Sequence, residues 1–136
     1  MASDLFQVIN PRALGAPKGF AHGLLAPAGA RLLFVAGQTA VDANGVVSSR
    51  EFAAQFDAAL ARVLMVVQEA GGTAAHVARM TVFVSDLDAY LASRQVLGEV
   101  WRSRMGTHYP AMALVEVNRL VDAGATVEIE AMAVIT

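Results

Sequence analysis

The chain has 136 residues, with 10 basic and 12 acidic side chains and a net charge of −2. This length suits one domain with a single core, over residues 1–136, and the near-neutral charge provides no basic surface for nucleic acid. Cysteine is absent, which excludes thiolate nucleophiles, disulfides and cysteine-type zinc sites. Hydrophobic residues make up 56% and charged residues 16%, so we expect apolar surface to be covered by further copies of the chain.

Targeting and metal signals are not found in the sequence. The first 15 residues lack a basic start followed by a long apolar run, and no segment approaches the roughly 18 apolar residues that cross a bilayer. The three histidines, His22, His76 and His108, have no metal-ligand spacing. We therefore expect a cytoplasmic protein without a membrane span, a metal site or a bound cofactor.

The first half of the chain predicts strands followed by a helix. Short strands are expected at residues 4–9 and 20–26, and a longer one at 30–41 is interrupted by Gly37, where the chain bends or passes close to another group. Asn44-Gly45 predicts a tight turn. A helix is expected over 48–72, because Ser48 and Glu51 have capping-box spacing and an apolar stripe repeats every 3.6 residues.

The second half alternates strands with one more helix. A strand at 76–85 should place Ala78, Met80, Val82 and Val84 on one face, and a helix at 85–106 should begin at Ser85. Alternating strands follow at 111–117 and 125–136. This order predicts an α+β fold, one mixed sheet with two helices on one face, and leaves the other face for another copy of the chain.

Three acidic residues interrupt these last strands. Glu128 and Glu130 are two residues apart and share one side of their strand, where they could hold a water molecule, act as a general base or form a solvated face. Glu116 shares a face with apolar neighbours, and we expect it to pair with Arg119 or with a neighbouring subunit.

Two further residues are candidates for binding. Arg94 lies three residues from both Leu91 and Leu97, on the apolar stripe of the second predicted helix, where its charge needs a partner. It could reach the solvent rim, pair with a carboxylate at a subunit interface, or bind a ligand. His108 is a second candidate because it precedes the turn into the strand at 111–117.

Five segments in succession resemble the YjgF/RidA family of reactive intermediate deaminases, which also carries the older label endoribonuclease L-PSP. They are VAGQTAVDANG, QFDAALARVLMVVQEAGG, VARMTVFVSDLDAY, YPAMALVEVNRL and VEIEAMAV. The resemblance covers nearly the whole chain. It implies a chorismate-mutase-like α+β fold and a homotrimer with three equivalent clefts between subunits.

The resemblance also implies a chemistry and its residues. Family members hydrolyse small enamines and imines without a cofactor; an arginine grips the substrate carboxylate and a glutamate holds the attacking water. The glutamate is retained here as Glu128, whereas the arginine position is Met112 and the cleft tyrosine position is Phe20. Leu114 replaces a small or sulfur-bearing residue, and Arg94 stands where the family has asparagine.

These replacements change what the cleft can hold. Methionine offers a soft apolar surface and no charge, so Met112 and Phe20 should form an apolar wall. The backbone at Ala111 and Leu114 would orient the ligand. A ligand anion would have to be gripped from elsewhere, and the candidates are Arg94, Lys18 and His108.

Three functions follow from this reading. The first is a divergent homotrimer that binds, and could hydrolytically deaminate, a small imine, enamine or related amine. The second is a non-catalytic trimer that binds a small metabolite and reports it to a partner. The third, ribonuclease activity, is disfavoured by the net charge of −2 and the lack of a basic stripe.

Overall fold

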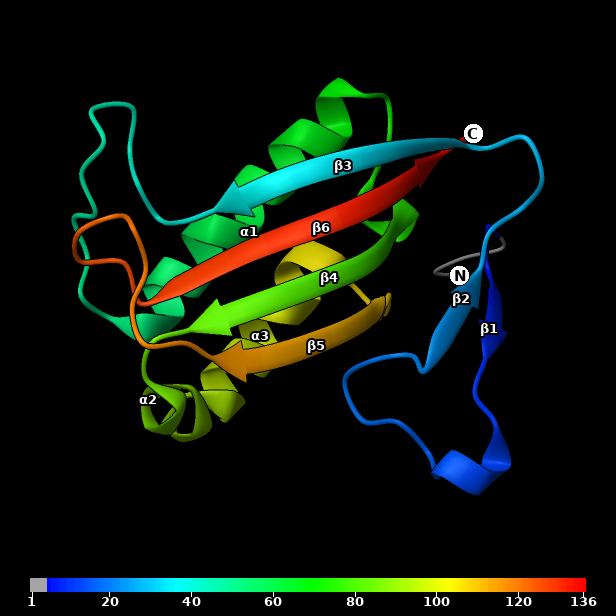
Figure 1. Cartoon of the computed structure of the whole chain (residues 1–136), viewed down its shortest axis with the longest axis horizontal. Coiled ribbons are helices and arrows are strands. Elements are labelled where there is room, and N and C mark those ends of the chain that lie inside the picture. Colours follow the sequence, from blue (N-terminus) through cyan, green and yellow to red (C-terminus); the bar gives the residue numbers. More distant parts are fainter. Residues whose placement is uncertain (1–4) are drawn as a thin grey trace.

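A four-stranded mixed sheet covered on one face by helices forms the body of the protein, in a computed structural model that describes residues 5–136 (Figure 1). Its strands lie in the order β3 (Arg31–Gln38), β6 (Val127–Ile135), β4 (Val77–Val84) and β5 (Ala111–Glu116). The β4–β5 pair is parallel, and β6 runs antiparallel to both β3 and β4. The covering helices are α1 (Phe52–Glu69), α2 (Leu87–Ala92) and α3 (Arg94–Met105). The predicted α+β class is confirmed.

A separate two-stranded sheet stands beside this body (Figure 1). It consists of β1 (Gln7–Ile9) and β2 (Gly23–Leu25), joined through a short 3-10 turn at Arg12–Leu14. A single bridge between Ala21 and Ala111 connects this region to β5. The expectation of one mixed sheet therefore holds for β3 to β6, whereas β1 and β2 pair only with each other; residue 4 of the predicted first strand lies outside the described residues.

Helix α1 begins later than predicted. Glu51 is its N-cap and Ser49 Oγ accepts a hydrogen bond from Glu51 N at 3.2 Å, so the expected Ser48–Glu51 capping box is wrong. The predicted end is confirmed: Gly71 adopts a φ of 90°, a conformation that glycine tolerates. The apolar stripe faces the sheet, with these residues buried: Phe52, Ala53, Phe56, Ala59, Leu60, Val63, Leu64 and Val67.

The second predicted helix is divided into α2 and α3 at Ser93. The Ser93 hydroxyl donates to the Ala89 carbonyl at 2.7 Å, a bond that competes with the helical ladder, and α3 then starts from Ser93. The cap was also misassigned, because the Asp86 carboxylate accepts from Ala89 N at 3.1 Å where Ser85 was expected to act. The single helix expected over 85–106 is therefore wrong.

The two faces of the sheet differ sharply in burial. Val77, Met80, Val82 and Val84 of β4 are fully buried against the helices. A register shift between Val77 and Arg79 turns Val77 inward in place of Ala78, which corrects the predicted face by one residue.

The opposite face carries exposed apolar side chains. Leu32 is 57% exposed, Phe34 70% and Val115 43%. Their strand partners Val134, Met132 and Phe83 share this face. None of the helices within residues 5–136 is long and apolar enough to cross a membrane.

Candidate functional site

A cleft of about 280 Å³ opens on the helix-covered side of β5. It lies where this edge strand, the helices and the loop before β2 meet. Its lining is mostly aliphatic and aromatic, as in most small-molecule sites. The lining residues are Gly19, Phe56, Val82, Tyr90, Arg94, Leu97, Gly98, Trp101, Tyr109, Met112 and Leu114.

Strand β5 provides an apolar floor. The parallel register places Met112 beside Met80 and Leu114 beside Val82, so both side chains point toward the helices. Both are half-buried and pack against the core. Ala111 pairs with Arg79 and therefore belongs to the open face, although its backbone contacts the cleft loop through Ala21.

Helix α3 provides one wall of the cleft. Arg94, Leu97, Gly98 and Trp101 are spaced i, i+3, i+4 and i+7, which puts them on one helical face. The Trp101 Nε1–H donates to the His108 carbonyl at 3.1 Å. Its ring stacks on Tyr109, with centroids 5.8 Å apart and planes at 7°. Of these four residues only Arg94 was singled out from the sequence as a binding candidate, although the same spacing could have identified the other three.

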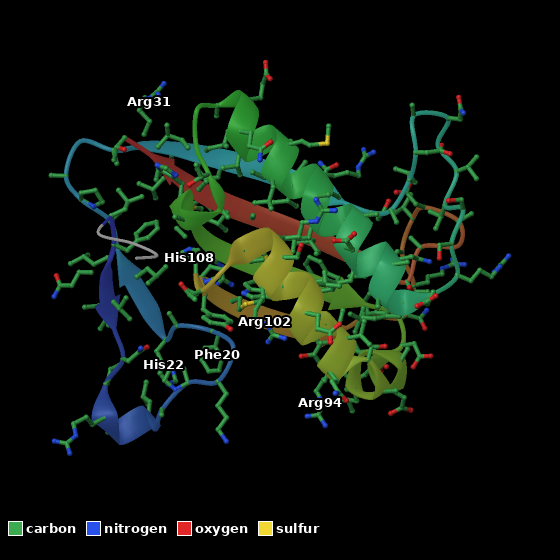
Figure 2. The ribbon with its side chains drawn as sticks, turned by 180° about the vertical axis from the view of Figure 1, so that it is seen from behind. Phe20, His22, Arg31, Arg94, Arg102 and His108 are labelled. Atoms are coloured by element: carbon green, nitrogen blue, oxygen red, sulfur yellow. The ribbon has the colours of Figure 1, made fainter. Side chains whose placement is uncertain are left out.

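Arg94 is exposed and points outward from the start of α3 (Figure 2), and it lines the cleft at its rim. Its Nε donates to the Leu91 carbonyl at 3.3 Å. Within residues 5–136 the observed ion pair joins Arg104 to Asp57, at 2.7 Å, and no carboxylate pairs with Arg94. Arg94 is also the one charged side chain among the described residues that line the cleft. Its side chain reaches the solvent at this rim, which is one of the three roles expected for it.

The loop before β2 closes another side. Ala21 N donates to the Pro110 carbonyl at 3.0 Å, which fastens the loop to the start of β5. Gly19 lines the cleft, and Phe20 is half-buried next to it, with its ring edge-on to His22 at 5.1 Å. Phe20 therefore lies beside the cleft and is not part of its lining. Figure 2 shows Phe20 near His22, in the loop before β2.

His108 lies in the core, outside the lining of the cleft. Its side chain is 4% exposed, its Nε2 lies 2.7 Å from the Val77 carbonyl, and its ring stacks on Phe6. Burial lowers the pKa of His108, so the ring is neutral at pH 7 and donates its Nε2–H to that carbonyl. A neutral, engaged ring has no charge to offer a ligand anion, and the contact of His108 with the cleft wall is its backbone carbonyl, which accepts from Trp101.

Glu128 lies on the opposite face of the sheet from Met112. It pairs with Phe83, which points away from the helices, and its carboxylate lies over Gly37. A Cβ at Gly37 would collide with that carboxylate, so the predicted close approach at this glycine is confirmed. One chain therefore does not bring Glu128 together with Met112.

The remaining acidic candidates lie apart from the cleft. The Glu116 carboxylate accepts from Leu87 N at 2.8 Å and so caps α2; the expected pair with Arg119 is wrong. Glu130 is exposed two residues beyond Glu128 on the open face. In the described part of the chain no three acidic or histidine side chains gather as a metal site.

Known proteins are similar to this chain in both sequence and fold. The family model described as Endoribonuclease L-PSP matches residues 12–135. A RutC family protein of Haemophilus influenzae is 36% identical, over 76% of this chain and 78% of that protein. A Rid family protein of unknown function from Yersinia pestis, YyfB, has 32% identity and a TM-score of 0.81 over 94% of this chain and 97% of its own.

A liganded structure is also similar. Escherichia coli TdcF with bound serine is 27% identical, with a TM-score of 0.68 over 97% of this chain and 98% of that chain. The YjgF gene product of the same organism is 29% identical, with a TM-score of 0.67 over 97% and 98%. The family model, over residues 12–135, spans the described elements from the loop before β2 to the end of β6. The chain belongs to the YjgF/RidA family.

Proposed function

We propose that the chain acts as a homotrimer that binds, and hydrolytically deaminates, a small imine or enamine in clefts between subunits. The observation that carries this proposal is the opposite orientation of Met112 and Glu128 in one chain. A site that contains both must draw them from two subunits. The exposed Leu32, Phe34 and Val115 of the open face supply apolar surface for such an association.

In this site Glu128 holds the attacking water. Its carboxylate accepts a proton as the water oxygen bonds to the imine carbon, and it returns that proton to the nitrogen to give a neutral carbinolamine. The carboxylate then moves the proton of the carbinolamine hydroxyl to the amine as the C–N bond breaks, which forms the C=O bond and releases ammonia. The product is a carbonyl compound, and no cofactor takes part. Gly37 supports this role, because its missing side chain leaves room for the carboxylate. The serine bound to TdcF supports an amino-acid-like ligand for the fold.

A second candidate function is ligand binding without turnover. Met112 favours it, because a thioether occupies the position where the family resemblance expects the arginine that grips the substrate carboxylate. Under this alternative, imine or keto-acid ligands would raise the melting temperature and be recovered unchanged.

The experiment measures ammonia or carbonyl release from imines generated in situ by an amino-acid oxidase. Glu128→Gln should abolish turnover, whereas Glu130→Gln, two residues along the same face, should retain it. Met112→Arg tests the second function, because an inactive wild type that gains activity on this change would be a binding protein on an intact scaffold. Light scattering establishes the oligomeric state, and a monomer at micromolar concentration would overturn the inter-subunit site.

A further inference from the structure

Gly98 is an unusual residue for the middle of α3. Glycine in a helix interior destabilises the folded state relative to alanine, and it is normally retained where a side chain would clash. Here a Cβ would meet only Arg102 Nη1, at 3.6 Å, an ordinary contact. Packing within the described chain therefore does not require glycine at this position. What Gly98 does is widen the cleft that it lines.

Arg94 lies one turn before Gly98 on the same helical face. It places one positive charge at the rim, without a carboxylate partner in residues 5–136. A guanidinium without a carboxylate partner can bind the carboxylate of a ligand through two parallel hydrogen bonds. A second carboxylate on the same ligand would find no other cation along the described lining.

The space beyond Gly98 is apolar. Met112 and Leu114 form its floor, and the stacked rings of Trp101 and Tyr109 bound it with a rigid aromatic surface. Thioether and aromatic groups attract flat or branched apolar bodies, whereas a small polar ligand would leave this surface uncovered.

We propose that the cleft selects monocarboxylates with a bulky apolar or aromatic body, whose carboxylate is bound by Arg94 and whose body fills the space that Gly98 leaves open. This inference rests on the proposed function, since it names the class of imine and of keto-acid product that the same site takes. The substrates are then the 2-imino acids of aromatic and branched side chains.

Calorimetric binding of stable keto acids to the full-length protein tests this selection without turnover. The probes are phenylpyruvate, 4-methyl-2-oxopentanoate, pyruvate and oxaloacetate. We expect the first two to bind at least about 10-fold more tightly than the last two. Equal or tighter binding of pyruvate or oxaloacetate, or no binding of any probe, overturns the proposal.

Gly98→Ala separates a ligand role from a structural one. Alanine should raise the melting temperature by about 2 to 4 °C, weaken phenylpyruvate binding about 10-fold and leave weak pyruvate binding unchanged. A lower melting temperature with unchanged selectivity would show that Gly98 serves packing, and would overturn its role here.

Arg94→Gln tests the anchor. It should weaken phenylpyruvate binding about 10-fold and leave binding of the neutral phenylpyruvate methyl ester unchanged. The matched control is Arg31→Gln, which removes the same charge at the start of β3, far from α3 (Figure 2). Equal losses in both variants would show a general charge effect and remove Arg94 as the anchor.

The measurements of binding and of turnover can contradict the two proposals independently. Selective binding with no ammonia release from any imine would leave the ligand class standing and remove the hydrolysis proposed for Glu128. Ammonia release that favours the imines of small or acidic side chains would leave the hydrolysis standing and overturn the ligand class.

Discussion

The two faces of the sheet differ in how their apolar side chains are covered. On one face Ile129 and Val82 are fully buried beneath α1 and α3 by the chain itself. On the other, Phe34 is 70% exposed, and the carboxylates of Glu128 and Glu130 share the surface with it. The first face is covered within one chain, whereas the second is open and is the face that the proposed trimer would cover; the proposed catalytic acid lies on the second.

The largest effect on stability should come from a cavity-forming substitution on the helix-covered face of the sheet. Ile129→Ala removes a fully buried side chain from the centre of β6 and should lower the free energy of unfolding by about 2 to 5 kcal/mol. Urea denaturation at several protein concentrations measures it. The loss should persist at every concentration, because the contacts that are lost lie within one chain; a loss that vanished at high concentration would place Ile129 at an interface.

The next effect concerns the open face of the sheet. Phe34→Asp puts a charge into the exposed apolar surface and should convert the proposed trimer into monomers that keep the helical circular dichroism signal. Light scattering provides the measurement. Met65→Asp is the control, since Met65 is 65% exposed on α1, away from the open face, and should leave the trimer intact. Equal dissociation in both variants would contradict the assignment of this face.

Periodicity predicted most of the helices and strands, and where the prediction failed, local hydrogen bonds or strand pairing were the cause. The alternation of β6 correctly separated Glu128 and Glu130 from Val127, Ile129 and Ala131. The second helix was wrong because the Ser93 hydroxyl bonds to the Ala89 carbonyl, a choice that hydrophobic spacing does not encode. The same holds for the bulge near Ala78, which depends on how β4 pairs with β6.

The site was partly predictable for a related reason. Family segments led to Met112 and Leu114, and helical spacing led to Arg94; the fold brings all three together in one cleft. That Glu128 lies on the other face follows only from the strand register, because the pattern within one strand does not say how it matches its neighbours. Gly98 and Trp101 were missed. An apolar helical face is normally assigned to the core, and only the structure shows that a cleft lies beside this one.

A smaller effect should distinguish the role of Gly37 from that of an ordinary strand glycine. In Gly37→Ala the new Cβ must displace the Glu128 carboxylate, which should lower imine turnover at least about 10-fold while changing stability by about 1 kcal/mol or less. The comparison is Gly23→Ala in β2, where the added Cβ makes only ordinary contacts at 3.5 Å and should leave turnover unchanged. Full activity in Gly37→Ala would show that Glu128 does not need its present position.

The smallest effect is a pH dependence of the free energy of unfolding that arises from the buried His108. Burial holds the pKa of His108 below its usual value of about 6.5, so the folded ring stays neutral while the unfolded ring gains a proton as pH falls. Its contribution to stability is therefore full above about pH 6.5 and declines below it, by at most about 1.4 kcal/mol per pH unit. His108→Gln keeps a donor for the Val77 carbonyl and should flatten the profile of unfolding free energy between pH 7 and 5. The same slope in His22→Gln and in His108→Gln would contradict this origin, because the His22 ring lies outside the core.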